Sequence, residues 1–110
     1  MIDMTFDGIT LRQPEKKDGV RLANFVRISP PLDMNSTYCN VLQCYHFRQT
    51  CILAELDGEI IGYVTGYRVP EQPHIYFLWQ VGVGKEGRGK GLATKMIQAI
   101  FARDSCRGVT

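Results

Sequence analysis

Hydrophobic positions along the chain change from strand-like to helix-like spacing. Ile9 and Leu11 alternate with polar residues between positions 5 and 13 and predict a first strand that ends at Pro14. A polar loop over residues 15–19 separates this strand from the next apolar segment. The chain therefore is expected to open with a strand rather than a helix.

Two helices are expected next. Apolar side chains at helical spacing predict the first helix, and they are Val20, Leu22, Ala23, Phe25 and Val26. A second group falls at positions i, i+3, i+4 and i+7, which form one face of a helix: Tyr38, Val41, Leu42 and Tyr45. Asn35 or Ser36 is expected to cap the second helix, because its side-chain oxygen can accept a backbone N–H of the first turn. His46 lies beside the apolar face.

Strands dominate the middle of the chain. Residues 50–56 and 59–69 are joined by Asp57-Gly58, the dipeptide that favours a tight β-hairpin. Residues 75–81 are almost continuously apolar, as expected of a strand that is covered on both faces. A strongly amphipathic helix follows, with apolar residues Leu92, Ala93, Met96, Ile97, Ile100 and Phe101. The order of strand, two helices, three strands and helix predicts an α/β domain, and residues 108–110 can begin another strand.

Composition indicates one small globular domain over residues 1–110. Hydrophobic residues make up 45% and charged residues 22% of the chain, and the net charge is +2. This balance excludes a disordered chain and indicates neither a nucleic-acid nor a membrane partner. No apolar stretch approaches the ~20 residues of a membrane span, and no secretory signal precedes the first strand. The strands are too few to cover a buried central strand, so we expect the domain to be incomplete at its C-terminus.

The cysteines indicate a reducing compartment. Cys39, Cys44, Cys51 and Cys106 show no paired CxxC spacing. We interpret them as free thiols in the cytoplasm.

A glycine-rich segment, residues 82–91, lies between the last long strand and the last helix. Such a junction offers unpaired backbone N–H groups and the positive end of the helix dipole, which together bind phosphate. Arg88 and Lys90 add positive charge. A flexible strand-to-helix turn is the alternative interpretation.

Three phosphate-binding patterns fit this segment to different degrees. Residues 82–87 match the dinucleotide fingerprint GxGxxG, but helical periodicity begins only near Gly91, and the chain lacks a suitably placed acid. Gly84, Gly89 and Lys90 fit GxxxxGK, but Gly91 stands where the nucleotide P-loop needs a magnesium-binding Ser or Thr. Residues 88–93 satisfy a third pattern, Arg/Gln-x-x-Gly-x-Gly/Ala.

The third pattern resembles the acyl-coenzyme A loop of the GNAT superfamily of N-acetyltransferases. The resemblance implies the GNAT fold, a mixed central sheet flanked by helices, here without its C-terminal strands and helix. It also implies acetyl-CoA as co-substrate and no metal. Backbone groups of Val81 and Val83 are expected to pair with the pantetheine arm. The expected pyrophosphate-binding residues are Gly87, Arg88, Gly89, Lys90, Gly91 and Ala93.

A narrower resemblance extends over nearly the whole chain. Residues 31–39, His46-Phe47, Thr50-Cys51 and residues 77–81 are similar to the L-2,4-diaminobutyrate acetyltransferases of ectoine biosynthesis. The resemblance implies acetyl transfer to the γ-amine of 2,4-diaminobutyrate by direct attack, in a cytoplasmic homodimer. Members of that family continue past Thr110 with further strands and a helix.

The acceptor is a small zwitterion with a second ammonium, so the site needs donors, acceptors and a base. Asp33 is expected to grip an ammonium and to receive its proton, although it can also be a turn acid. Tyr38 can orient the substrate or simply pack, and His46 can be a base or a hydrogen-bonded structural residue. Side chains expected to line the pocket are Cys39, Trp79 and Gln80. A nucleophilic role for Cys39 is rejected, because no basic neighbour is evident that would lower its pKa.

Three further hypotheses remain at this point. The chain can be a GNAT enzyme for another small amine, or a non-catalytic fragment that binds coenzyme A. A dinucleotide-binding module is a more distant possibility, and it would bind NAD instead of acetyl-CoA.

Overall fold

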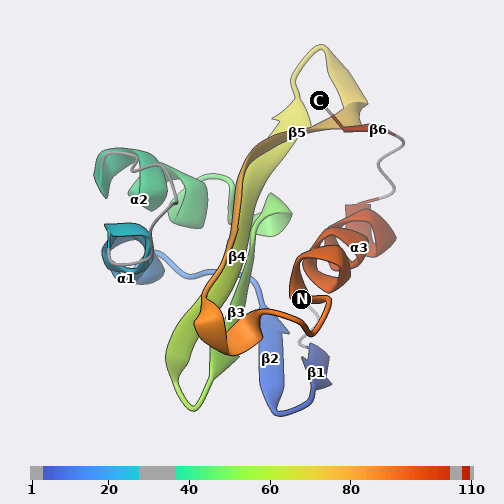
Figure 1. Ribbon diagram of the computed structural model, residues 1–110. Helices are drawn as coiled ribbons and strands as arrows, with labels where there is room; N and C mark the ends of the chain where they lie inside the picture. The colour runs from blue at the N-terminus through green and yellow to red at the C-terminus, as the bar shows by residue number, and fades with distance from the viewer. Residues whose placement is uncertain (1–3, 28–36, 105–107, 110) are drawn as a thin grey trace.

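A six-stranded sheet separates two helices on one face from a third helix on the other (Figure 1). The structure is a computed structural model that describes residues 4–27, 37–104 and 108–109. Its strands are β1 (Met4–Phe6), β2 (Ile9–Arg12), β3 (Ile52–Leu56), β4 (Glu59–Val69), β5 (Gln72–Val83) and β6 (Gly108–Val109). Its helices are α1 (Asp18–Arg27), α2 (Thr37–Tyr45) and α3 (Leu92–Asp104), with short 3₁₀ turns η1 (Arg48–Thr50) and η2 (Lys85–Gly87).

The strands lie in the sheet in the order in which they occur in the chain. Every neighbouring pair from β1 to β5 is antiparallel, whereas β5 and β6 are parallel. The predicted mixed sheet flanked by helices is therefore confirmed, as is the strand expected over residues 108–110. The prediction of a single first strand is wrong, because residues 4–12 form two short strands joined by a turn.

Two Asp-Gly turns join neighbouring strands of this sheet. Asp57 and Gly58, with φ of 53° and 80°, join β3 to β4 as predicted. Asp7 and Gly8, with φ of 49° and 77°, make the same kind of turn between β1 and β2. Positive φ at both central residues is the mark of a type I′ turn, whose twist matches that of the strands it joins.

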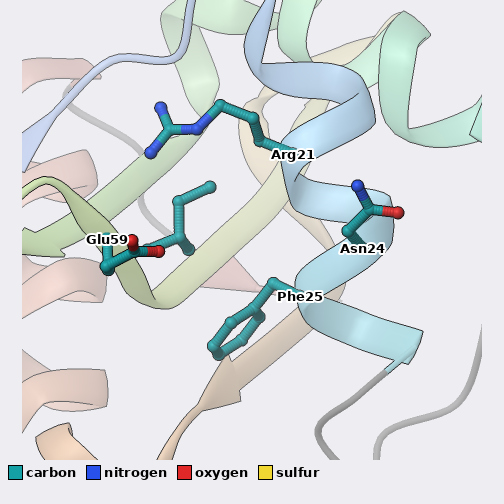
Figure 2. A pocket seen from close by; sticks show the side chains of 5 residues that line it. Arg21, Asn24, Phe25 and Glu59 are labelled. Carbon is teal, nitrogen blue, oxygen red and sulfur yellow. The ribbon is translucent and has the colours of Figure 1, made fainter.

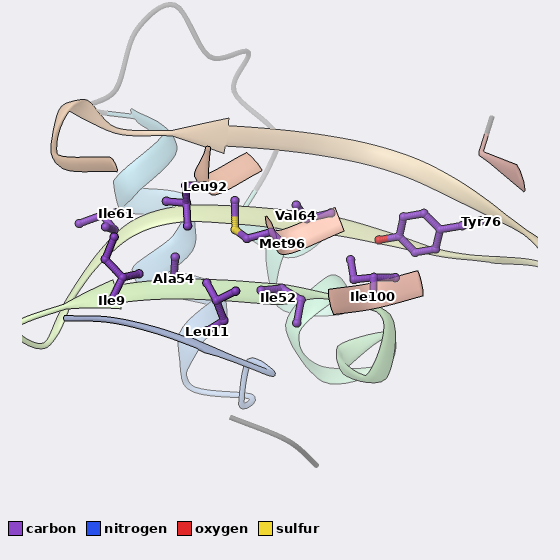
Figure 3. Close-up of a cluster of buried hydrophobic side chains, with 10 residues drawn as sticks. All are labelled: Ile9, Leu11, Ile52, Ala54, Ile61, Val64, Tyr76, Leu92, Met96 and Ile100. Carbon is purple, nitrogen blue, oxygen red and sulfur yellow. The ribbon is translucent and has the colours of Figure 1, made fainter. Parts of the chain in front are cut away.

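Alternation along the strands sends apolar side chains to both helical layers. Leu53 lies in the cluster against α1 and α2, whereas its neighbours Ile52 and Ala54 lie in the cluster against α3. Figure 3 shows the α3 cluster, in which Met96 and Ile100 pack over the sheet. The residues predicted to face the core from α3 are confirmed at these positions.

An ion-pair network fixes α1 against the sheet. Asp18, the first residue of α1, has a fully buried side chain. Its carboxylate accepts hydrogen bonds from both terminal nitrogens of Arg12, at 2.8 and 3.0 Å. Arg21 donates to the same carboxylate at 2.7 Å. Both arginines also reach Glu55 on β3, at 2.7 and 3.1 Å. The network therefore joins β2, α1 and β3 through four side chains.

The predicted apolar face of α2 is wrong in part. Tyr45 is half exposed and lies over the ammonium of Lys16, 4.9 Å from the ring centre. The buried residues include two amides, Asn40 and Gln43. A buried amide is tolerated where it is hydrogen-bonded, and the Gln43 side chain lies 3.5 Å from the Cys51 sulfur, which donates to it. The caps predicted at residues 35 and 36 lie outside the described residues.

The prediction that β5 is covered on both faces is also wrong for the described chain. Its residues alternate irregularly between buried, half-buried and exposed, and Trp79 is 43% exposed. Pairing with β4 runs along the strand, but β6 contacts it only at Ile75 and Tyr76. Among the described residues, the second edge of β5 is thus open from Phe77 onward.

Candidate functional site

The glycine-rich segment forms a compact loop between β5 and α3. β5 ends at Val83 and α3 begins at Leu92, so the junction lies where the sequence predicts it. The first helical hydrogen bond runs from the Lys95 N–H to the Gly91 carbonyl at 3.1 Å. The N–H groups of the first turn of α3 consequently have no partner inside the helix and face the loop with the positive end of the helix dipole.

Glycine is required in this loop for two different reasons. Gly89 and Gly91 have φ of 78° and 69°, a region that other residues rarely adopt, and a Cβ at either position would meet open space. Gly87 is instead packed, since a Cβ there would overlap side chains of Leu92 and Val83. The loop is therefore closed toward the core and open outward at residues 89–91, where an anion can approach its backbone.

Two cations flank the open side of the loop. The side chains of Arg88 and Lys90 are exposed. Arg88 lies back along the end of β5, with its Nε 3.4 Å from the Val83 carbonyl oxygen. Positive charge thus lies beside both the loop and the strand end.

The register of β5 decides which backbone groups face its open edge. The Gly84 N–H donates to the Ile61 carbonyl of β4 at 2.7 Å. Antiparallel pairs alternate between residues that bond to each other and residues that turn their N–H and C=O groups outward. Val83 and Val81, which pair with Gly62 and Val64, therefore turn these groups away from β4. This edge presents the backbone pattern that an added extended chain requires.

A bulge separates this part of β5 from the rest of the strand. Gln80 pairs with Thr65 and Leu78 pairs with Gly66, so Trp79 is an extra residue without an opposite partner on β4. Bulges redirect side chains and occur often beside functional sites. Trp79, which the sequence predicts in the pocket wall, is thus the residue that the bulge displaces.

Trp79 and Cys39 lie together although forty residues separate them in the chain. The Trp79 side chain hydrogen-bonds the Cys39 sulfur on α2. Burial raises the pKa of the Cys39 thiol, and the hydrogen bond from Trp79 offsets only part of this effect. A thiol with a raised pKa is a poor nucleophile, in agreement with the rejection of an acyl-cysteine mechanism.

The structure locates only some of the other residues predicted for the acceptor site. His46 follows the last residue of α2, is exposed, and packs edge-on against the Tyr45 ring at 5.0 Å. The helix rises ~1.5 Å per residue, so His46 lies roughly 10 Å along α2 from Cys39. Tyr38 belongs to α2, and Asp33 lies outside the described residues.

Sequence reasoning missed an aromatic row that continues from Trp79. Phe77 lies 6.0 Å from Trp79 between ring centres, Tyr67 lies 5.3 Å from Phe77, and Phe47 lies 5.2 Å from Tyr67. The available signal was the i, i+2 spacing of Phe77 and Trp79, which places two aromatic rings on one side of a strand. The row leads from the bulge toward the end of α2.

A separate pocket of about 240 Å³ opens on the α1 side of the sheet (Figure 2). Its lining residues are Arg21, Asn24, Phe25, Glu59 and Ile60. None of the residues predicted to bind substrate is among these lining residues in the part of the chain that the structure describes. A Cβ on Gly84 would lie 3.2 Å from the Phe25 ring, so this pocket adjoins the back of the glycine loop.

Loop, strand edge and bulge together define an acyl-coenzyme A acetyltransferase fold, and residues 22–109 match the Acetyltransferase (GNAT) family. The chain belongs to this family. The dinucleotide fingerprint does not fit, because α3 begins five residues after Gly87 instead of within the motif. Among the described residues there is no cluster of three or more metal-ligating side chains, and no helix is long and apolar enough to cross a membrane.

Two curated relatives carry the same name. The chain is 48% identical over 95 residues to the L-2,4-diaminobutyric acid acetyltransferase of Methylotuvimicrobium alcaliphilum, covering 86% of this chain and 55% of that protein. It is 42% identical over 99 residues to the Vibrio cholerae enzyme of the same name, covering 90% and 57%. The chain thus spans little more than half the length of these relatives.

A solved structure is similar over the same part of the chain. The diaminobutyrate acetyltransferase EctA from Paenibacillus lautus, in complex with its substrate L-2,4-diaminobutyric acid and coenzyme A, matches with a TM-score of 0.83 at 35% identity. The match covers 90% of this chain and 60% of that protein.

Proposed function

We propose that the protein transfers an acetyl group from acetyl-CoA to the γ-amino group of L-2,4-diaminobutyrate, in ectoine biosynthesis. The observation that carries the proposal is the junction of β5, the glycine loop and α3, combined with 48% identity to an enzyme of this name. No metal takes part in the proposed chemistry.

The donor site would be built from backbone and two cations. Extended backbone at Val81 and Val83 would pair with the pantetheine arm, because the register turns their polar groups to the open edge of β5. The pyrophosphate would lie over the loop, against N–H groups and the charges of Arg88 and Lys90. Loop residues proposed for this contact are Gly89, Gly91 and Ala93, whereas Gly87 packs against the core and its N–H donates to the Gly84 carbonyl at 3.1 Å.

The acceptor amine must be neutral before it attacks. An alkyl ammonium has a pKa near ~10, so a base must take its proton at neutral pH. Asp33 is proposed to grip the substrate ammonium and receive the proton, with Tyr38 and His46 as further candidates for orientation and proton transfer. The amine nitrogen then attacks the thioester carbonyl carbon, and the amide bond forms as the carbon–sulfur bond breaks. The nitrogen loses its excess proton in this step, and the departing thiolate takes up one proton and leaves as the free coenzyme A thiol.

Groups around the bulge would hold the reacting atoms. The backbone of Trp79 or Val81 is proposed to polarise the thioester carbonyl, a form of electrostatic stabilisation that typically contributes a few kcal/mol. Cys39 and Trp79 would form part of the pocket wall, as their hydrogen bond holds them together. Gln80 is proposed to lie at the same wall, one residue beyond the bulge.

The resemblance also leads us to propose a homodimer that works in the cytoplasm during osmotic stress. The described cysteines, Cys39, Cys44 and Cys51, carry thiols and no disulfide, which suits a reducing compartment.

Calorimetric titration of the purified chain with acetyl-CoA tests the donor site, and a free-thiol assay after addition of diaminobutyrate tests transfer. Binding followed by thiol release supports the proposal. Release with other small amines but not with diaminobutyrate would assign a different acceptor, whereas binding without release would reduce the chain to a coenzyme A-binding unit. A folded chain that binds no acetyl-CoA would refute the donor site.

A further inference from the structure

The bulge at Trp79 lies between two fixed points of β5. On its C-terminal side, the ladder with β4 resumes at Gln80 and ends in the hydrogen bond from Gly84 to Ile61. On its N-terminal side, the ladder with β4 is itself irregular beyond Tyr76. β5 therefore enters the bulge through three regular pairs with β4, at Tyr76, Phe77 and Leu78, which lie between two register shifts.

Tyr76, the first residue of this short regular stretch, adds an interaction from within the core. The ring lies at one end of the α3-facing cluster, near Ile100 (Figure 3), and is almost fully buried. Its hydroxyl donates to the backbone carbonyl of Thr50 at 2.6 Å. Tyr76 thus reaches from β5 across β4 to the segment that precedes β3.

Glycine at position 66 of β4 permits this crossing. A Cβ on Gly66 would overlap both the Tyr76 hydroxyl and the Phe77 carbonyl oxygen. Gly66 also lies at the register shift, paired with Leu78 immediately beside the bulged residue. The close approach of β4 and β5 and the bulge therefore occur at the same place in the sheet.

Thr50 completes the arrangement from the other side. β3 begins at Ile52, so the carbonyl of Gly66 lies beyond the β3–β4 ladder. The Thr50 hydroxyl takes the place of a ladder N–H and donates to that carbonyl at 2.7 Å. Thr50 consequently receives a hydrogen bond from β5 through its backbone and gives one to β4 through its side chain.

We propose that Thr50, Gly66 and Tyr76 form a strap that sets the shape of the bulge and so positions Trp79. None of these three residues is among those proposed to bind either substrate, and the strap acts through the strand backbone. Its consequence for catalysis rests on the proposed function: the strap would aim the Trp79 side chain and the backbone groups that polarise the thioester. The glycine loop lies at the far end of β5, so donor binding should depend little on the strap.

The single tryptophan of the chain is Trp79, and its fluorescence reports on the bulge without any substrate. We would compare iodide quenching and anisotropy for Thr50→Val and Tyr76→Phe, which each remove one hydroxyl and keep the side-chain shape. Both variants should show stronger quenching and lower anisotropy, and Thr50→Ser should restore wild-type values. Tyr63→Phe is the matched control, because it removes another buried tyrosine hydroxyl from the α1-facing cluster. Unchanged Trp79 signals in both folded variants would overturn the proposal.

Kinetics then separates positioning from general destabilisation. Misplacing reacting groups by about 1 Å can cost up to ~10²-fold in rate, so we expect kcat to fall about tenfold in either variant. The dissociation constant for acetyl-CoA should stay within about twofold, and Tyr63→Phe should keep both values. Equal loss of acetyl-CoA affinity and kcat would overturn the positioning role. If the wild-type chain transfers no acetyl group, the proposed function fails, and the fluorescence comparison still decides whether the strap exists.

Discussion

Replacing Asp18 with asparagine should destabilise the fold far more than loss of an ordinary surface ion pair. Asp18→Asn keeps the size of the side chain and removes its charge. In the wild-type protein the carboxylate accepts hydrogen bonds from Arg12, Arg21 and the Glu15 N–H, at 2.7 to 3.0 Å. The variant leaves two guanidinium groups that share the single carboxylate of Glu55.

The expected loss follows from the burial of these groups. Breaking a buried ion pair by removing one partner costs ~3–5 kcal/mol, because a charge remains uncompensated. Asp18 has no exposed side-chain surface, but the Arg21 side chain is 38% exposed and can regain water when its partner is lost. We therefore expect the free energy of unfolding to fall by about 3 kcal/mol, at the lower end of that range.

Urea denaturation monitored through Trp79 fluorescence measures this loss directly. Glu15→Gln is the matched control, since Glu15 pairs with Lys17 at 3.4 Å and both side chains are largely exposed. Such a pair typically contributes less than ~1 kcal/mol, so the control should remain near the wild-type midpoint. A loss below about 1 kcal/mol for Asp18→Asn would show that the network behaves like exposed ion pairs, and the reasoning would be wrong.

The same network makes stability depend on pH in the acid range. Burial alone would raise the pKa of Asp18, but hydrogen bonds from Arg12, the Glu15 N–H and Arg21 outweigh it and lower the pKa below its ordinary 3.8. The pKa of Glu55 is lowered from 4.5, mainly by its hydrogen bond from Arg12. Both groups therefore stabilise the fold fully above about pH 4.5, and this contribution is lost as pH falls through the lowered values. The difference between wild type and Asp18→Asn should narrow over that interval.

Three further outcomes are expected. Arg88→Ala should weaken acetyl-CoA binding by about 1–3 kcal/mol in calorimetry, whereas Arg27→Ala, which removes an exposed arginine outside the loop, should not. Equal affinities of the two variants would show that Arg88 does not contact the coenzyme. Asp33→Ala should impair acceptor binding or turnover in the thiol-release assay and spare acetyl-CoA affinity, so normal kinetics would remove Asp33 from the site. Met96→Ala should lower the free energy of unfolding by about 2–5 kcal/mol in urea, because Met96 is fully buried, and a smaller loss would mean that the core closes over the cavity.

Sequence patterns predicted elements best where one residue pair determines a local conformation. Asp57-Gly58 predicted its hairpin because both residues tolerate positive φ. The equivalent pair Asp7-Gly8 was missed, since the strands on either side have only three and four residues. The apolar positions do change phase across this turn, from Met4 and Phe6 to Ile9 and Leu11. A short strand gives too few positions to separate one long strand from two.

Helix periodicity identified α2 but not which of its faces is buried. The spacing of apolar residues predicts that the helix face with Tyr45 is buried. In the structure, Gln43 and Asn40 are buried and Tyr45 is half exposed. Partners outside the helix decide the difference: Cys51 donates to the Gln43 side chain, whereas Lys16 offers Tyr45 a cation at the surface. These partners are eight or more residues away in the chain, beyond the range of a helical pattern.

The donor and acceptor parts of the site also differ in whether their residues are close together in the chain. Donor residues 81–93 are continuous in the chain, and their chemistry depends on local backbone: a strand end, positive φ at Gly89 and Gly91, and a helix N-terminus. The acceptor wall joins Cys39 on α2 to Trp79 on β5, and the position of Trp79 depends on a register shift that only pairing with β4 creates. A motif can specify the first kind of site, whereas the second exists only once the sheet has formed. Substitutions that disturb the sheet at Gly66 should therefore affect the acceptor wall first.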